Sequence, residues 1–256
     1  MLSDQAKAAF SSLELEYEPV ALKYSFTKPD NVELYQGKLA FCEFVRECQK
    51  TGRTFCVNKD NDDCYGKMSL GMVEKPPVTA SGQAGFDFEM YRTPLACQQL
   101  YQKLPVLVPG TVRYVTFAPV STCSFDPDLI LCIASLEKAE ILMRATCYIS
   151  GDLWESVSSP VISCAWMYAY PIISGKVNHI TTGFYHGLKR RKAYPAGLRM
   201  ISIPFQKIDE VAAALQQMPF TAIAFRDDEA SKQELRRRMD HWQEMAKESG
   251  TTVDLH

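Results

Sequence analysis

Two cysteine-containing segments, about 120 residues apart, share one order of features that could support chemistry. The first contains residues 41–46 (FCEFVR), a glycine at 52, a short apolar stretch and residues 64–67 (CYGK). The second contains residues 163–168 (SCAWMY), a glycine at 175, a short apolar stretch and residues 185–188 (YHGL). A helix with a cysteine near its start, a glycine stop, a strand and an X-X-Gly turn recur in the same order, which indicates a duplicated fold with a site between the copies.

The thiols of Cys42, Cys64 and Cys164 are the candidate metal ligands. Thiolates select zinc, copper(I) and iron–sulfur clusters, and ligands from two related halves can converge at their interface. The chain has no C-x-x-C pair, the pattern that marks zinc ribbons and bacterial ferredoxins. Zinc or an iron–sulfur cluster is therefore one hypothesis, and buried cysteines at a duplicated packing position are the other.

We expect a small molecule, a metal or a cluster to bind in a cysteine-lined cleft between the halves. Cys42 lies on the flank of the helix predicted over residues 39–50, away from its apolar face, and is expected to face this cleft. The candidate ligand-binding residues, drawn from both segments, are Cys42, Arg46, Cys64, Tyr65, Gly66, Cys164, Tyr185, His186 and Gly187.

The alternative function is an enzyme with a cysteine nucleophile and a histidine base. Cys64 follows a polar loop and begins a predicted short helix, where the helix dipole is expected to lower the pKa of its thiol. His186 occupies the equivalent turn of the second segment and is suited to accept a proton from Cys64 or Cys42.

A basic turn offers a separate site for an anion. Residues 183–187 (GFYHG) precede four cations at 189–192 (KRRK), and exposed backbone N–H groups beside cations can bind phosphate or carboxylate. The turn matches neither a Walker A motif nor a G-x-G-x-x-G fingerprint, and a solvated basic loop is the competing interpretation. We expect Arg190 and Arg191 to be exposed and to contribute little to stability.

Predicted strands and helices alternate along the chain around these residues. Hydrophobic periodicity and turn residues predict strands at 18–24, 54–57, 112–120, 128–134, 176–182 and 198–203. Residues 76–85 are predicted to be a loop and the likeliest hinge. The same signals predict helices at 3–13, 39–50, 64–70, 93–104, 135–148, 161–170, 208–218 and 231–247, the last opened by a capping box at Ser231.

This order indicates an α/β or α+β fold with a mixed central sheet, flanking helices and internally duplicated halves. We expect a single compact domain over residues 1–256, with pseudo-repeat halves at 18–75 and 111–218 and a C-terminal helix at 227–248. A length of 256 residues is sufficient to bury a large core.

The composition argues against some kinds of binding partner and indicates a cellular compartment. The formal net charge of −2 and the pI near 6.1 argue against nucleic acid as a partner. The longest apolar stretch, residues 160–173, is too short to span a bilayer, so we expect no membrane association. Residues 1–15 carry no secretory signal pattern, and nine cysteines, an odd number, indicate reduced thiols in a cytoplasmic protein. The oligomeric state is left open.

The chain resembles a prokaryotic family known only as domain of unknown function 169. That resemblance implies that the members of the family share the fold of this chain. It implies no established activity. Many members have a further cysteine at the second X-X-Gly turn, where this chain has residues 184–186 (FYH), so a fourth ligand here would come from His179, His186 or Cys56. The resemblance is carried in order by residues 19–24 (PVALKY), 41–46 (FCEFVR), 64–67 (CYGK), 70–71 (LG), 113–115 (RYV), 117–119 (FAP), Cys164 and 183–187 (GFYHG).

Overall fold

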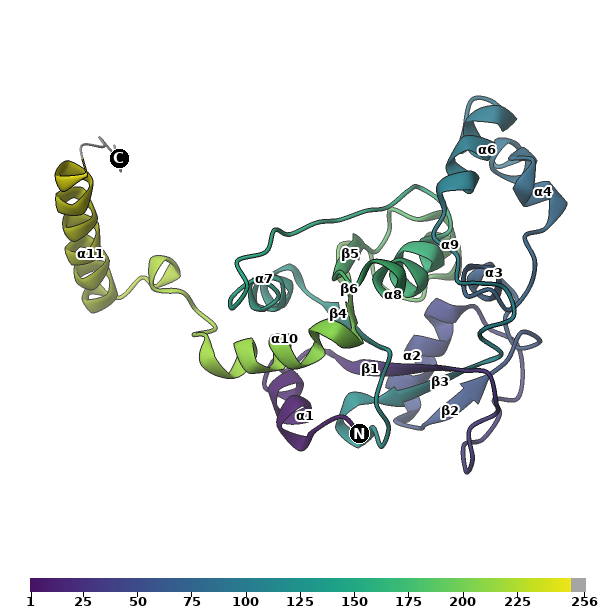
Figure 1. Cartoon of the computed structure of the whole chain (residues 1–256), viewed down its shortest axis with the longest axis horizontal. Helices are drawn as coiled ribbons and strands as arrows, with labels where there is room; N and C mark the ends of the chain where they lie inside the picture. Colours follow the sequence, from purple (N-terminus) through teal and green to yellow (C-terminus); the bar gives the residue numbers. More distant parts are fainter. Residues whose placement is uncertain (250–256) are drawn as a thin grey trace. The chain divides into compact units, whose positions relative to one another are not determined.

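A six-stranded antiparallel sheet forms the centre of the fold in the computed structural model, which describes residues 1–249 (Figure 1). Its strand order is β2-β3-β1-β4-β6-β5. Contacts divide the chain into two compact units, Met1–Gln216 and a second unit that begins at Gln217. The strands are β1 (Tyr17–Ser25), β2 (Phe55–Val57), β3 (Tyr114–Pro119), β4 (Leu129–Ala134), β5 (Asn178–Thr181) and β6 (Arg199–Pro204).

All five ladders between these strands are antiparallel. At the centre of the sheet, β1 pairs with β4 with Val20 opposite Leu131 and Leu22 opposite Leu129. The predicted combination of helices with a central sheet is confirmed, but the prediction of a mixed sheet was wrong. The connections between consecutive strands are long, for example residues 58–113 between β2 and β3, so their length alone does not set the direction in which neighbouring strands pair.

Helices cover both faces of the sheet. Figure 1 shows α7 and α8 on opposite sides of β6. In the first unit the helices are α1 (Asp4–Ser11), α2 (Phe41–Thr51), α3 (Gly66–Ser69), α4 (Pro77–Ala80), α5 (Gln83–Asp87), α6 (Pro94–Lys103), the 3-10 turn η1 (Val120–Thr122), α7 (Leu136–Ala145), the π-helical η2 (Ala165–Ala169), α8 (Tyr170–Ser174), α9 (His186–Arg191) and α10 (Phe205–Gln217), whose last residue belongs to the second unit. The second unit contains the 3-10 turn η3 (Ile223–Phe225) and α11 (Glu229–Glu248).

The main core lies between the sheet and the helices that carry Cys42 and Cys164. The face of α2 formed by Phe41, Phe44, Val45 and Cys48 is fully buried, as its spacing predicts. Rings from α2, β2 and β3 meet there, with Phe44 5.8 Å from Phe117 between centroids. This packing fixes α2 on β1 and β3, while η2 and α8 pack on β5 and β6.

Three local predictions were wrong. Residues 76–85 form most of α4 and α5 instead of a loop, because Pro77 at the first turn favours a helix start and Gly82 supplies the left-handed residue between the two helices. The basic segment after Tyr185 is the short helix α9. The cap of α11 is Asp228, whose carboxylate accepts the N–H of Ser231, so Ser231 does not open that helix.

No helix within residues 1–249 has both the length and the apolar character that crossing a membrane requires.

Candidate functional site

The three cysteines singled out by the sequence lie together in the main core. Cys42 is in the first turn of α2, Cys164 precedes η2, and Cys64 lies two residues before α3. All three belong to one hydrophobic cluster. They are close enough that negative charge on Cys64 would raise the pKa of Cys42, and charge on either would raise that of Cys164.

Burial keeps these thiols protonated. It raises the pKa of Cys42 to about 12 and raises that of Cys164 well above its ordinary value. Burial also raises the pKa of Cys64, although the N–H of Tyr65 opposes the shift. The predicted lowering of the Cys64 pKa was therefore wrong, because desolvation outweighs a helix dipole that comes from the single turn of α3.

The cysteine cluster is not arranged as a metal site. Within residues 1–249, no three side chains of His, Cys, Asp or Glu are placed to hold a metal ion. The hydroxyl of Tyr168 is buried beside Cys164 and Cys42 without a hydrogen-bond partner. The arrangement thus gives zinc or an iron–sulfur cluster no geometric support.

Other predicted site residues separate from one another. The imidazole of His186 stacks on Phe88, with ring centroids 5.2 Å apart. No hydrogen bond or ion pair in the described part of the chain joins His186 to Cys42 or Cys64. Tyr65 packs in a second cluster that contains Tyr101, whereas Tyr185 is buried in the main core.

The two glycines of the X-X-Gly turns have different surroundings. A Cβ atom on Gly66 would lie 2.1 Å from a ring carbon of Phe41, so glycine is required for α3 to pack against α2. A Cβ on Gly187 would meet nothing within 4 Å. Packing therefore explains why position 66 is a glycine, but it does not explain the glycine at position 187.

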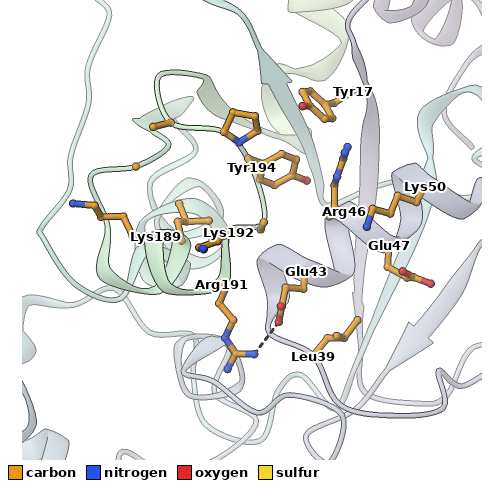
Figure 2. A pocket seen from close by; sticks show the side chains of 15 residues that line it. Tyr17, Leu39, Glu43, Arg46, Glu47, Lys50, Lys189, Arg191, Lys192 and Tyr194 are labelled. Carbon is orange, nitrogen blue, oxygen red and sulfur yellow. Dashed lines mark hydrogen bonds and ion pairs between the residues drawn. The ribbon is translucent and has the colours of Figure 1, made fainter.

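A cavity of about 750 Å³ lies between α2 and the segment that contains α9 and the loop before β6 (Figure 2). Of the residues predicted to line the cysteine cleft, only Arg46 lines this cavity; the cysteines do not. From the predicted basic turn, Gly183, Lys189, Arg191 and Lys192 also line it. Its size falls within the range of about 300–1,000 Å³ typical of small-molecule sites. The lining residues are Tyr17, Leu39, Glu43, Arg46, Glu47, Lys50, Gly183, Leu188, Lys189, Arg191, Lys192, Ala193, Tyr194, Pro195 and Ala196.

Positive charge dominates this lining, with five cationic side chains against two carboxylates. Arg191 is the one cation among them with an ion pair in residues 1–249: its guanidinium lies 2.8 Å from both Glu43 and Asp63. Arg191 is only one-quarter exposed, so the prediction of an exposed Arg191 was wrong. The other four cations, Arg46, Lys50, Lys189 and Lys192, have no carboxylate partner among the described residues.

Arg46 is held in place by aromatic rings. Its guanidinium carbon lies 4.5 Å from the ring centroid of Tyr17 and 5.7 Å from that of Tyr194. The two rings meet edge to face, and the hydroxyl of Tyr194 donates to the side-chain oxygen of Gln49. Figure 2 shows the Arg46 side chain beside both tyrosines. Cation–π contacts of this kind orient a guanidinium while leaving its N–H groups available.

The loop that closes the cavity has a defined conformation. The hydroxyl of Thr182 donates to the carbonyl of Pro195, and the N–H of Leu198 donates back to that hydroxyl. Gly183 has φ +90°, and a Cβ there would lie 2.7 Å from the Cβ of Ala196. The two ends of the loop therefore approach each other closely because position 183 has no side chain.

Sequence reasoning missed the tyrosines of the cavity. Tyr17 begins β1 and Tyr194 lies in the loop after α9, so neither belongs to a local motif with Arg46. The available signal was the basic run at 189–192, from which the sequence predicted an anion site near this segment.

The chain matches the family DUF169, described as an uncharacterised ArCR family, over residues 11–214. No curated protein and no solved structure matches the chain. The matched region includes the whole six-stranded sheet, the cysteine cluster and every residue that lines the cavity. The chain therefore belongs to the DUF169 family.

Proposed function

We propose that this protein binds a small anionic molecule in the cavity between α2 and α9. The observation that carries the proposal is the convergence of four cations without carboxylate partners in residues 1–249 on one ligand-sized cavity. Like charges held together in a partly enclosed space repel one another, and a bound anion relieves that repulsion. The cysteine-nucleophile alternative has less support. Burial keeps the thiols protonated, and His186 makes no hydrogen bond to Cys42 or Cys64 among the described residues.

We further infer that the cavity lies between duplicated halves. In sequence order the first three strands are central, edge and intermediate in the sheet, and β4, β5 and β6 repeat that pattern. The glycine stops also correspond, since Gly52 after α2 and Gly175 after α8 are both left-handed C-caps. On this inference α2 belongs to the first half and the 183–196 segment to the second, so a ligand would contact both.

Thermal unfolding in the presence of anions tests the binding proposal. We expect phosphate, pyrophosphate or an organic phosphate to raise the melting temperature, since saturation at a hundredfold excess over Kd stabilises the folded state by about 2.7 kcal/mol. That corresponds to a rise of roughly 5–11 °C for a domain of this size. Equal ionic strength of sodium chloride is the control for general salt effects.

A pair of matched variants locates the effect. Lys192→Glu places a negative charge in the cavity and should abolish the rise in melting temperature. Arg190→Glu makes a comparable change on the same helix but outside the lining, and should retain the rise. Loss of the rise in both variants, or in neither, would contradict binding in this cavity.

A further inference from the structure

Two groups of cations lie on opposite sides of the cavity. Arg46 and Lys50 occupy successive turns of α2, whereas Lys189 and Lys192 belong to α9 and its C-cap. Figure 2 shows the two groups on separate ribbons, with Tyr194 between them. A single phosphate fills only a small part of about 750 Å³.

The Arg46 side is preorganised for an oxoanion. Its guanidinium is fixed by Tyr17 and Tyr194, and it makes no hydrogen bond or ion pair within residues 1–249. The side chain is half-buried, and its N–H donors have no acceptor among the described residues. A planar carboxylate or phosphate edge satisfies two such donors at once, which lysine cannot do with the same geometry.

The α9 side presents lysine in an uncommon conformation. Lys192 is the C-cap of α9 with φ 51°, and its N–H donates to the carbonyl of Leu188. Glycine is the usual residue at a left-handed C-cap, since a side chain there is strained. A lysine at this position places a cation at the cavity wall, on the side away from α2.

We propose that the ligand carries two oxoanion groups on one small molecule, one bound by the edge of Arg46 and the other by Lys192. The ligand bridges α2 and the C-cap of α9. This inference rests on the proposed anion-binding function and specifies its ligand class. Phosphate and carboxylate share the required chemistry, and the choice of probes separates them.

Calorimetric titration of the full chain with matched probes tests the inference. The pairs are pyrophosphate against phosphate, fructose 1,6-bisphosphate against fructose 6-phosphate, and glutarate against butyrate. We expect at least one doubly anionic probe to bind about tenfold or more tightly than its singly anionic counterpart, because the second contact becomes intramolecular. The pair that shows the larger ratio identifies phosphate or carboxylate as the preferred group.

Two variants test which cation binds each oxoanion group of the ligand. Lys192→Gln should reduce the ratio between the paired probes to near one while leaving the singly anionic probe almost unchanged. Arg46→Lys should weaken both members of a pair by about tenfold, because the charge remains and the bidentate geometry is lost. Arg190→Gln is the control and should bind both probes as the wild type does. Unchanged melting temperatures of the unliganded variants exclude misfolding.

The outcomes separate the inference from the function on which it rests. Equal affinity for paired probes in the wild type, or an unchanged ratio in Lys192→Gln, overturns the two-group ligand while leaving anion binding intact. No heat and no thermal stabilisation with any of the six probes overturns the proposed function and this inference together.

Discussion

Arg191 and Glu43 join the two sides of the cavity, with Nη1 of Arg191 2.8 Å from Oε2 of Glu43. Oε2 of Glu43 also accepts the N–H of Ala40, which caps the start of α2. Replacing Arg191 leaves Glu43 and Asp63 without their cation in a half-buried site. We expect Arg191→Gln to lower the free energy of unfolding by about 1–3 kcal/mol, less than for a fully buried pair.

Denaturant unfolding of Arg191→Gln and Arg190→Gln measures this difference. Arg190 is exposed, so its variant should lie within about 0.5 kcal/mol of the wild type. Equal stability of the two variants would show that the link between α9 and α2 contributes nothing.

The glycine at position 66 should tolerate no side chain. Gly66→Ala places a Cβ 2.1 Å from the ring of the fully buried Phe41, and overpacking of this kind costs about 1–3 kcal/mol or more. Gly187→Ala, in the second X-X-Gly turn, has open space and a helical neighbourhood, and should be neutral or stabilising by up to about 1 kcal/mol. The melting temperatures of the two purified variants measure this difference in stability. A melting temperature of Gly66→Ala close to that of the wild type would contradict the packing of α3 on α2.

The carboxyl of Asp62 should make stability depend on pH. Burial raises its pKa to about 6, although the N–H groups of Lys67 and Cys64 donate to it and oppose the shift. Below pH 6 the folded chain takes up a proton before the unfolded chain does. The contribution of Asp62 to stability therefore increases as the pH falls from about 7 to 4, by up to about 3 kcal/mol.

Unfolding free energies at several pH values test this dependence. Asp62→Asn cannot take up the proton, so the difference in stability between wild type and variant should move in favour of the wild type as the pH falls. Asp60→Asn, at an exposed position two residues away, is the matched control. A wild-type minus Asp62→Asn difference that stays constant from pH 7 to 4 would rule out the raised pKa.

Alkylation should find no activated cysteine. The raised pKa values of Cys42, Cys64 and Cys164 keep their thiols protonated at pH 7. With iodoacetamide and peptide mass spectrometry, we expect slow labelling that begins at the half-buried Cys64 and Cys147 and reaches the buried cysteines only on unfolding. Rapid labelling of Cys42 or Cys64 below pH 8 would instead favour the cysteine-nucleophile alternative.

The sequence predicted the elements whose signals are local. The apolar spacing of Phe41, Phe44, Val45 and Cys48 predicted the buried face of α2, and Gly52 predicted its end. The repeated order of cysteine, glycine and turn also led to three thiols that the fold does bring together. Their burial was one of two hypotheses that the sequence left open, because the depth of a side chain depends on partners from other elements.

The cavity depends on tertiary relationships that no local pattern records. Tyr17 and Tyr194 are 177 positions apart and meet only because β1 and the loop before β6 lie against α2. The exposed appearance of the basic run was misleading for Arg191, whose partners Glu43 and Asp63 come from distant segments. The sequence also could not predict whether neighbouring strands run parallel or antiparallel. The period of two in a strand shows where the strand lies, but not the direction of its partner.

Hydrogen–deuterium exchange with and without pyrophosphate tests whether an anion binds between α2 and α9. We expect slower amide exchange in peptides that cover residues 39–50 and 183–196, with little change in α11 and in the helices within residues 76–104. The protection should disappear in Lys192→Glu and persist in Arg190→Glu. Protection confined to other segments, or none at pyrophosphate concentrations that raise the melting temperature, would contradict the claim.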